Sequence, residues 1–415
     1  MNSELIYEYL DKIGRDGYKL GLDRMQKTLK ILGNPEKSFK IIHVAGTNGK
    51  GSTSTFIYQT LKEHGYKTGL FTSPHIINFY DRIKIDKEIS EEDFMRIFEI
   101  IKYTIEENDI KVSTFEFITL CAIYYFAEQK CEYVVLEVGM GGRLDATNAT
   151  EETLLSVITK IGLDHQEYLG NTLEEIAYEK ACIMKQNGRC VVYNQQESVL
   201  DVFREVAEER DNKLYICDFD EAKNIEINAT HNSFDWKNLH IETRLVGRYQ
   251  LFNAQLALSA IDVLRNELDL SDEDIINGFK NAYIPARFDV IRHNPTVIYD
   301  GGHNADGVKA LKSSIESVFG DKKIVFVYGV LKDKDYNDEI KLIHENAKAF
   351  VTFTPDSPRA LKAEDLKKQI EAYSDNVVAK SNVNDAVDYA IEHFKDDVII
   401  IFGTLYSAEQ AYEHL

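Results

Sequence analysis

The sequence contains little cysteine, little proline and no long apolar run, and each of these shortages excludes a class of protein. The five cysteines are an odd number without a Cys-x-x-Cys pair, which predicts reduced thiols and a cytoplasmic location. With six prolines and 44% hydrophobic residues, the composition is that of a folded protein rather than a disordered chain. The longest mostly apolar stretch, residues 117–127, is far shorter than the roughly 20 residues of a membrane span. The first residues are acidic and lack a signal peptide's apolar core, so we expect neither a membrane partner nor secretion.

The sequence also has fewer basic than acidic residues. Lys and Arg number 48 against 69 Asp and Glu, which gives a formal net charge of −21. The average field of such a chain repels DNA and RNA, and no run rich in Lys or Arg stands out against it. We therefore expect no nucleic-acid partner.

Short β-branched runs alternate with helical stretches almost from end to end, which is the pattern of parallel sheets flanked by helices. The 415 residues are enough for two or three domains. We predict an α/β protein with an N-terminal parallel-sheet domain over residues 1–290 and a smaller doubly wound domain over residues 291–415. The linker is expected near residues 285–296, which two prolines bracket.

The expected strands of the first domain are residues 40–44, 67–71, 133–138, 155–159 and 189–193. Those of the second are residues 297–299, 324–328, 349–353, 377–379 and 398–402. Ser90 with Asp93, and Thr172 with Glu175, are typical helix starts. The polar segment 218–244 alternates over short stretches and predicts a hairpin excursion, after which residues 250–264 return to helix.

The sharpest local feature is the string IIHVAGTNGKGSTSTF, in which a β-rich run enters a glycine-rich turn that opens a helix. Backbone N–H groups of such a turn can surround phosphate oxygens, Lys50 adds a positive charge, and the hydroxyl of Ser52 can coordinate Mg²⁺. The strict phosphate-loop spacing fails, because Val44 occupies the first glycine position and Gly51 follows the lysine. The string predicts a variant phosphate loop; a glycine-rich turn with a solvated lysine is the alternative.

A carboxylate near the phosphates is expected at the end of a neighbouring strand. Glu137 interrupts the otherwise apolar run 133–138 just before Gly139. A charge inside a buried strand costs several kcal/mol unless it is paired or meets a metal ion. Glu137 is therefore a candidate metal ligand, and a strand-end glutamate that reaches solvent is the alternative.

Three further residues follow strands at the same predicted sheet edge or lie on the next helix. Ser73 is a candidate second hydroxyl for Mg²⁺, although a serine that caps a turn fits the same pattern. His165 is a candidate ligand, although a lone histidine is more often a structural hydrogen-bonding group. Lys180, judged on its own, is a lysine on a helix surface.

Many short strings, in order between residue 46 and about residue 360, together resemble the folylpolyglutamate synthase/dihydrofolate synthase family of the Mur ligase superfamily. They are GTNGKGS, TSPH, TFEFIT, LEVGMGGRLDATN, GLDHxEYLG, EKACIMK, GRYQxxNAxxA, PARFDV, YDGGHN, GxLKDKD and PRA. The resemblance covers essentially the whole chain. It implies an N-terminal P-loop ATPase domain joined to a smaller Rossmann-like domain, with the active site in the cleft between them.

The resemblance also implies a reaction, which is an ATP-dependent amide ligation. A substrate carboxylate takes the γ-phosphate of ATP to become an acyl phosphate, the amine of glutamate attacks it, and phosphate leaves. The implied substrates are ATP, L-glutamate and either tetrahydrofolate or dihydropteroate. The implied enzyme is a cytoplasmic monomer that uses Mg²⁺, with two ions expected.

The resemblance assigns roles to individual residues. It implies ATP binding by Thr47, Asn48, Gly49, Lys50, Gly51, Ser52, Asn253, Arg287, Asp300 and His303. It implies metal binding by Ser52, Ser73, Glu137, His165 and Lys180, and catalytic roles for Lys50, Glu137, His165 and Lys180. It implies substrate binding by Arg82, Ser113, Thr114, Phe115, Glu116, Leu144, Asp145 and Ala146.

Some of these assignments carry their own alternatives. Lys180 matches a lysine that family members carbamylate with CO₂, which requires a neutral amine and hence a lowered pKa. A core position is the alternative for Phe115. For Arg287, Asp300 and His303 the alternatives are an interdomain salt bridge or a turn cap. The family has other residues at the positions of Cys182, Ala286, Asp289 and Gly302.

Two other functions remain as alternatives to a folate–glutamate ligase. The first is another Mur-type amino-acid ligase, which would carry an additional N-terminal domain for which the 45 residues before the loop leave no room. The second is a P-loop kinase or nucleotide switch. A guanine-specific NKxD string is absent from the sequence, and a complete second domain has no purpose in a simple switch.

Overall fold

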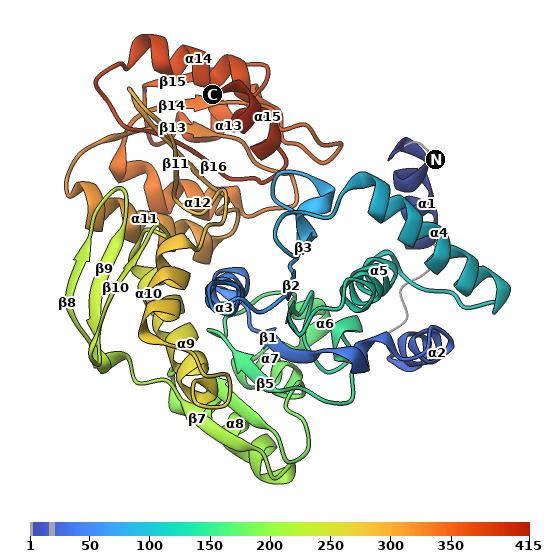
Figure 1. Cartoon of the computed structure of the whole chain (residues 1–415). Coiled ribbons are helices and arrows are strands. Elements are labelled where there is room, and N and C mark those ends of the chain that lie inside the picture. The colour runs from blue at the N-terminus through green and yellow to red at the C-terminus, as the bar shows by residue number, and fades with distance from the viewer. Residues whose placement is uncertain (1–2, 16–20) are drawn as a thin grey trace. The chain divides into compact units, whose positions relative to one another are not determined.

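The computed structural model describes residues 3–15 and 21–415 of the chain. The chain forms two compact units, and each is described by itself. The first comprises Met1–His75, Tyr80–Glu221 and Asn253–Phe279, and the second comprises Ile76–Phe79, Ala222–Phe252 and Lys280–Leu415. Both are of the predicted α/β class, with mainly parallel sheets (Figure 1).

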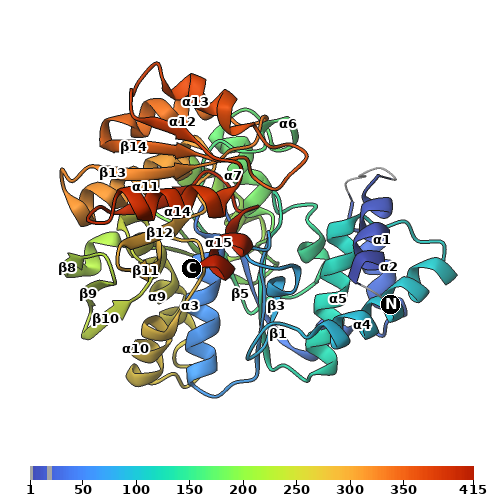
Figure 2. The same cartoon turned by 90° about the horizontal axis from the view of Figure 1, so that it is seen from above.

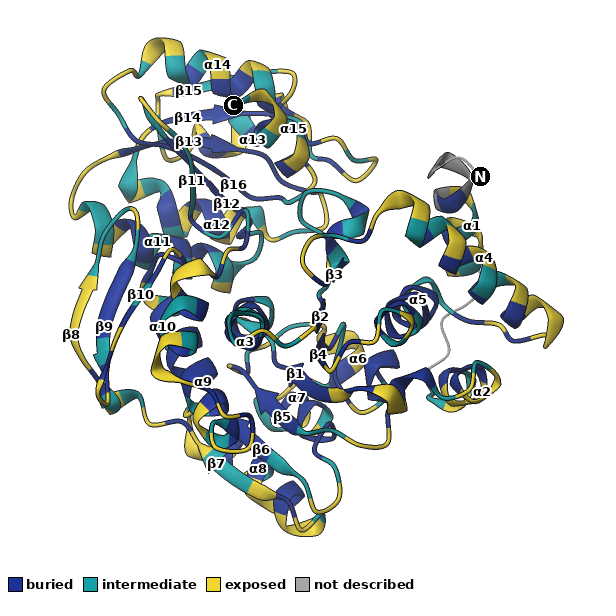
Figure 3. Ribbon diagram, viewed as in Figure 1, coloured by how far each residue is buried: buried dark blue, intermediate teal, exposed yellow. Residues whose placement is uncertain are grey.

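The first unit is built on a seven-stranded sheet in the order β3-β2-β4-β1-β5-β6-β7. Its strands are β1 (Lys40–Ala45), β2 (Thr68–Phe71), β3 (Ile83–Lys84), β4 (Tyr133–Glu137), β5 (Leu155–Ile158), β6 (Arg189–Val192) and β7 (Lys213–Ile216). All neighbours pair in parallel except β3, which runs antiparallel to β2. Every residue of β4 is buried, as expected for a strand covered on both faces (Figure 3).

The helices wholly within the first unit connect or cover these strands. They are α1 (Ser3–Arg15), α2 (Asp23–Ile31), α3 (Lys50–Glu63), α4 (Glu91–Glu107), α5 (Thr114–Glu128), α6 (Gln166–Leu169), α7 (Leu173–Ala181) and α8 (Glu197–Glu209). Short 3-10 turns lie at η1 (Pro35–Ser38), η3 (Ala146–Ala149) and η4 (Phe219–Glu221). One buried cluster joins Ile158 and Val192 of the sheet to Ile176 of α7 and Phe203 of α8. That packing fixes α7, and with it Lys180, beneath the sheet edge.

Three elements include residues of both units, because the units are interleaved in sequence. They are η2 (Phe79–Arg82), α9 (Arg248–Leu264) and α10 (Asp272–Asn281). Within the first unit, Phe279 of α10 stacks on Phe56 of α3 with the ring centroids 4.6 Å apart. The residues of α9 from Asn253 onward belong to the first unit, which brings Asn253 next to the loop described below.

The second unit contains a three-stranded antiparallel sheet, which is what the predicted hairpin excursion becomes. Its strands are β8 (Ala222–Ile227), β9 (Asn232–Trp236) and β10 (Leu239–Thr243), in the order β10-β9-β8. The larger sheet has the order β11-β12-β16-β13-β14-β15. Its strands are β11 (Asp289–His293), β12 (Thr296–Asp300), β13 (Ile324–Tyr328), β14 (Ala347–Thr352), β15 (Val377–Ala379) and β16 (Ile399–Phe402).

The larger sheet is doubly wound, as predicted. Its helices are α11 (Ala305–Phe319), α12 (Tyr336–Ile343), α13 (Ala363–Ile370), α14 (Val383–His393) and α15 (Ala408–His414), with a 3-10 turn η5 (His344–Asn346). Ile298 and Phe326 pack with α11, α12 and α13, whereas the next residues, Tyr299 and Val327, pack with α14 and α15. The alternation places helices on both faces of the sheet (Figure 2).

The strand predictions fail mainly at sheet edges. The expected strands all form, within a residue or two at each end, but β3, β7 and β11 were not predicted. Edge strands lack the buried apolar run of a central strand; β7, for example, has no fully buried residue. Strand β11 lies inside the predicted linker and pairs antiparallel with β12, so it crosses the boundary expected after residue 290. That boundary stays a prediction.

Candidate active site

The phosphate loop lies between the end of β1 and the start of α3, as the sequence predicts. Gly46 and Gly49 have φ values of 150° and 91°, which side-chain-bearing residues rarely adopt. A Cβ on Gly46 would lie 1.7 Å from Oγ1 of Thr159, and one on Gly49 would lie 2.2 Å from Oδ1 of Asn253. The backbone at Gly46 and Gly49 therefore lies too close to Thr159 and Asn253 to leave room for a side chain, and Asn253 lies directly beside the loop.

The start of α3 offers backbone donors. Gly49 is its N-cap, and no side chain in the described part of the chain caps it. The first N–H groups of a helix have no partner within the helix, and its dipole favours negative charge there. The loop therefore has the geometry of an anion site, and Lys50 and Ser52 lie in the first turn.

Thr47 anchors this loop to the segment that follows β5. Its N–H donates to the carbonyl of Lys160 at 3.0 Å. Its hydroxyl donates to the carbonyl of Gly162 at 3.1 Å and accepts from the N–H of Gly162 at 3.0 Å. Since these contacts occupy the side chain, Thr47 contributes to the loop first as a structural anchor.

Two lysines donate to the same carbonyl oxygen of the loop. Nζ of Lys50 lies 3.1 Å from the carbonyl of Gly46 and 3.3 Å from that of Thr47. Nζ of Lys180, on α7, lies 2.9 Å from the carbonyl of Gly46. Lys180 is 4% exposed, so it is not the surface lysine that its position alone suggested. Burial, and then the nearby charge of Lys50, lower its pKa to about 7.

Glu137 ends β4 beside this loop. It is 3% exposed, and its Oε2 accepts a 3.0 Å hydrogen bond from the N–H of Ser73. A Cβ on Gly51 would lie 3.7 Å from the same oxygen, so the glutamate points at the first turn of α3. The neighbouring residue in that turn is Ser52, which is also buried. The predicted oxygen donors Ser52, Ser73 and Glu137 thus belong to one small region.

That region suits Mg²⁺, which prefers oxygen ligands and is usually held by one or two carboxylates together with waters and substrate phosphates. The buried carboxylate of Glu137 lies next to a loop built for phosphates, which is this arrangement. No group of three or more His, Cys, Asp or Glu side chains in the described residues could hold a metal ion by itself. A magnesium ion here would take its remaining ligands from hydroxyls, waters or substrate phosphates.

The segment after Glu137 is held in place by Asp145. This buried carboxylate accepts hydrogen bonds from the N–H of Met140 at 2.9 Å and from the N–H and hydroxyl of Thr147 at 3.0 and 2.5 Å. Burial raises the pKa of Asp145. The hydroxyl of Thr147 also lies 2.8 Å from Nε2 of His43, whose pKa burial lowers to about 3. Asp145 and Thr147 therefore link the loop after β4 to the central strand β1.

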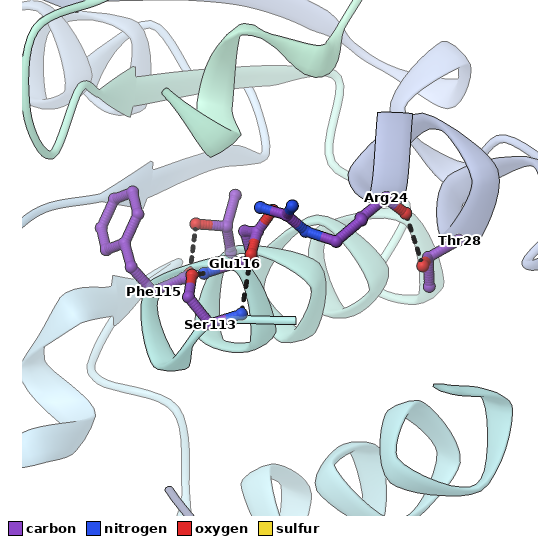
Figure 4. A network of polar contacts seen from close by, with 6 residues as sticks. Arg24, Thr28, Ser113, Phe115 and Glu116 are labelled. Atoms are coloured by element: carbon purple, nitrogen blue, oxygen red, sulfur yellow. Dashed lines mark hydrogen bonds and ion pairs between the residues drawn. The ribbon is translucent and has the colours of Figure 1, made fainter. Parts of the chain in front are cut away.

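The start of α5 carries four of the predicted substrate residues (Figure 4). Ser113 and Glu116 form a capping box, in which the Ser113 hydroxyl accepts from the Glu116 N–H and the Glu116 carboxylate accepts from the Ser113 N–H. Arg24 of α2 donates to Oε1 of Glu116 through Nη2 at 2.9 Å and Nε at 3.2 Å. The hydroxyl of Thr114 donates to the carbonyl of Leu10.

Phe115 differs from its neighbours because its ring faces the sheet edge. A Cβ on Gly139 would lie 2.4 Å from the ring, and the ring centroid is 6.0 Å from that of Phe71. Phe115 is partly exposed. Leu144 is also partly exposed, whereas Ala146 is buried. The structure thus brings an accessible aromatic surface next to the loop that follows Glu137.

Two further predicted site residues, His165 and Arg82, each contact a residue close to them in the sequence. His165 has a side chain 54% exposed, and its Nε2 lies 3.8 Å from Asp164. Arg82 donates through Nη2 to Nδ1 of His75 at 3.0 Å. Burial, together with the charge of Arg82, lowers the pKa of His75 to about 4, so this histidine is neutral at pH 7.

In the second unit, Arg287 lies on a sharp turn before β11. Its neighbours Ala286 and Phe288 both have positive φ, at 56° and 53°. Asp300, at the end of β12, accepts from the N–H of Phe288 at 3.0 Å and from that of Gly302 at 2.8 Å. Burial raises the pKa of Asp300, although the charge of Arg287 opposes that change. The predicted pair Arg287 and Asp300 is therefore one local cluster.

His303 extends this cluster on the same segment. Its Nδ1 lies 2.8 Å from the carbonyl of Gly301 and donates to it, because a carbonyl can only accept. The proton on Nδ1 leaves Nε2 of a neutral His303 as the acceptor. Sequence reasoning missed the partners that hold the cluster, Asp289 and Tyr412. Asp289 lies in the string PARFDV but was noted only as a departure from the family, and Tyr412 lies outside the strings that carry the resemblance.

Other important residues also escaped prediction. Arg24 and Glu116 are 92 positions apart, and nothing in the sequence pairs them. Lys185 is a partly buried lysine whose Nζ contacts Asn148 and Thr150, and desolvation lowers its pKa to about 8. Among 48 basic residues, no local pattern distinguishes it.

The comparisons with known proteins identify the family of the chain. Residues 44–261 match the Mur ligase middle domain, and residues 286–405 match the Mur ligase glutamate ligase domain. The chain is 38% identical over 406 residues to the dihydrofolate synthase/folylpolyglutamate synthase of Bacillus subtilis, covering 94% of each chain.

Solved structures give the same relationship. A Mycobacterium tuberculosis folylpolyglutamate synthase complexed with ADP matches with a TM-score of 0.88 at 28% identity, covering 99% of this chain and 97% of that one. Escherichia coli FolC in complex with DHPP and ADP matches with a TM-score of 0.86 at 29% identity, covering 98% and 95%.

The two matched domains follow one another along the chain, the middle domain first and the glutamate ligase domain second. The chain belongs to the Mur ligase family and is an ATP-dependent ligase. Within that family it belongs with the folylpolyglutamate and dihydrofolate synthases, as the sequence resemblance implied. In the described part of the chain, no helix has the length and apolar character needed to cross a membrane.

Proposed function

We propose that this ligase adds L-glutamate to tetrahydrofolate, extending a polyglutamate tail, and also adds it to dihydropteroate. The observation that carries the proposal is the buried carboxylate of Glu137 beside a phosphate loop that also holds a buried lysine, Lys180. The relatives support the two substrates, because the Bacillus subtilis protein is named for both activities, dihydrofolate synthase and folylpolyglutamate synthase. The complex of FolC with DHPP and ADP supports a pterin site and a nucleotide site in one enzyme.

The reaction begins when the substrate carboxylate attacks the γ-phosphorus of ATP, which forms an acyl phosphate and releases ADP. The amine of glutamate then attacks the acyl carbon, a proton is lost from nitrogen, and inorganic phosphate leaves. Residues 47–52 bind the nucleotide phosphates, and Lys50 leaves the carbonyl of Gly46 to pair with them. Such catalysis is mostly positioning and neutralisation of charge.

Ser52, Ser73, Glu137, His165 and Lys180 would hold up to two Mg²⁺ ions, which supply charge neutralisation at the transferring phosphate. The side chain of His165 is 54% exposed, and its Nε2 lies 3.8 Å from Oδ2 of Asp164. The carboxylate of Glu137, by contrast, is buried against α3.

Lys180 is the proposed site of carbamylation. Its neutral amine attacks CO₂, an N–C bond forms and one proton is released, which turns a cation into an anionic oxygen ligand. The pKa of about 7 supports this step, because about half of the amine is neutral at neutral pH. Mass spectrometry of the native protein with and without bicarbonate tests it; an unmodified Lys180 together with full activity of Lys180→Ala would exclude it.

Folate binding is proposed at the start of α5 and the loop after β4, by Arg82, Ser113, Thr114, Phe115, Glu116, Leu144, Asp145 and Ala146. Phe115 offers a partly exposed ring on which a flat pterin can stack. Nucleotide contacts are proposed for Asn253 and, from the second unit, for Arg287, Asp300 and His303. We also propose a cytoplasmic monomer, and a division into folding domains near residue 290.

One assay tests the function. Purified protein is incubated with Mg-ATP, glutamate and either tetrahydrofolate or dihydropteroate, while ADP release and the mass of the pterin product are followed. We expect ADP release that requires both glutamate and a pterin, and a product heavier by one glutamyl residue. ADP release that does not depend on glutamate would contradict the ligase function. If only one of the two pterins gives a product, the proposed activity on the other is excluded.

A further inference from the structure

The turn that presents Arg287 is held in a conformation its residues disfavour. Ala286 and Phe288, on either side of the arginine, both have left-handed backbone conformations. For residues with a Cβ this conformation is unfavourable, because the Cβ comes too close to the following carbonyl oxygen. The turn therefore needs tertiary contacts to keep it in place.

Three backbone groups of the turn carry those contacts. The carbonyl of Ala286 accepts from the N–H of Gly301 at 2.8 Å, and the N–H of Phe288 donates to Asp300 at 3.0 Å. The N–H of Ala286 donates to the hydroxyl oxygen of Tyr412 at 2.6 Å. The first two partners lie on the segment that itself bears Asp300 and His303, whereas Tyr412 lies on the last helix, α15.

Tyr412 is itself well fixed. Its hydroxyl donates to Oδ2 of Asp289, so the oxygen is free to accept from the N–H of Ala286. Its ring lies 5.9 Å from that of the buried Tyr299 and packs against a core cluster of the second unit. The same Oδ2 of Asp289 accepts a second hydroxyl, that of Tyr283, at 2.7 Å.

We infer that Tyr412 is a positioning residue for the ligase reaction, which holds Arg287 in its nucleotide-contacting conformation through the N–H of Ala286. The inference rests on the nucleotide contact proposed above for Arg287. Removing the hydroxyl leaves the buried N–H of Ala286 without its acceptor, while the left-handed conformation keeps its cost. The turn then opens, and Arg287 spends less time in position.

Tyr283 provides a matched control. Tyr412→Phe and Tyr283→Phe each remove one tyrosine hydroxyl that donates to Asp289. Only Tyr412→Phe also removes the acceptor of the Ala286 N–H. A difference between the two variants therefore reports the contact with the turn, and not the loss of a hydroxyl near Asp289.

The first readout needs no substrate. Trypsin cuts after arginine, so the cleavage rate at the bond between Arg287 and Phe288, followed by mass spectrometry, measures how often the turn opens. We expect Tyr412→Phe to be cut about tenfold faster than the wild type, because one buried hydrogen bond contributes about 1.4 kcal/mol. Tyr283→Phe should stay within twofold. Equal cleavage of the two variants would overturn the inference.

The second readout is kinetic. For Tyr412→Phe we expect the KM for ATP to rise about tenfold, with the KM values for glutamate and the pterin within twofold of the wild type. Adding Ala286→Gly should restore both the KM and the cleavage rate, because glycine adopts the left-handed conformation at little cost. A general loss of stability would instead lower the fraction of active enzyme and hence the apparent kcat, with all three KM values unchanged, and that result would also refute a positioning role.

Arg287→Ala separates this inference from the function on which it rests. If that variant leaves the KM for ATP unchanged, the proposed nucleotide contact of Arg287 fails, while the cleavage experiment still decides whether Tyr412 holds the turn. If Arg287→Ala raises the KM for ATP and Tyr412→Phe does not, the proposed function stands and the positioning role of Tyr412 is excluded.

Discussion

Replacing Lys180 with methionine should make the protein more stable, by an amount that depends on pH. Burial lowers the pKa of Lys180 from 10.5 to about 7. At 1.36 kcal/mol per pKa unit, this shift lowers the free energy of unfolding by about 5 kcal/mol at low pH, compared with a chain in which residue 180 does not titrate. Methionine has a similar shape and no charge, and the Gly46 carbonyl keeps Lys50 as a donor.

The direction of this pH dependence follows from whether the folded or the unfolded chain holds the proton of Lys180. Below pH 7 both the folded and the unfolded chain carry a protonated Lys180, and the full cost is present. Between pH 7 and 10.5 only the unfolded chain remains protonated, so the wild type gains stability as pH rises. The advantage of Lys180→Met should therefore shrink by about 2 kcal/mol between pH 7 and 9.

Urea unfolding at pH 7, 8 and 9 in CO₂-free buffer, followed by circular dichroism, measures this difference. Lys180→Gln is the matched control, since it too lacks a titrating group and its profile should run parallel to that of Lys180→Met. A stability difference between wild type and Lys180→Met that stays constant from pH 7 to 9 would refute a lowered pKa. The proposed carbamylation would then lose its physical basis as well.

Further predictions concern the phosphate loop, the carboxylate beside it and the start of α5. Glu137→Gln should lower kcat at least about 100-fold without loss of folding, because it removes the carboxylate charge that would hold Mg²⁺ at the transferring phosphate. Near-normal turnover would exclude that role. Gly46→Ala should abolish ATP binding in a calorimetric titration, since its Cβ would collide with Thr159. Arg24→Met should cost about 2–4 kcal/mol in urea unfolding by leaving the buried Glu116 unpaired, and the double variant with Glu116→Met should recover most of it. Chelation of divalent cations should stop ADP release, and Mg²⁺ should restore it; activity that survives chelation would contradict a magnesium requirement.

The order of strand, glycine loop and helix could be predicted because it is local. The phosphate loop and the carboxylate at the end of β4 each depend on a short run of sequence, and a charged residue that ends an apolar strand is conspicuous. The capping box of Ser113 and Glu116 was not predicted, although it has the same spacing as the helix starts predicted at Ser90 and Thr172; its residues were assigned only to substrate binding.

What could not be predicted depends on contacts distant in sequence. Lys180 has the sequence context of a surface lysine, and only the packing of α7 under the sheet buries it. The left-handed conformation of Ala286 is equally hidden, because a pattern search expects glycine at such a position. The strand β11 was read as linker, since an edge strand without a buried apolar run resembles a connection.

The carbonyl of Gly46, which accepts from both Lys50 and Lys180, has a thermodynamic consequence. An anion in the loop that draws Lys50 away changes the electrostatic environment of Lys180, and hence its affinity for a proton. Linkage requires the reverse effect to be equal, so the protonation state of Lys180 must change the affinity of the loop for the anion by the same free energy. A single oxygen atom thus makes nucleotide affinity a function of pH in the neutral range.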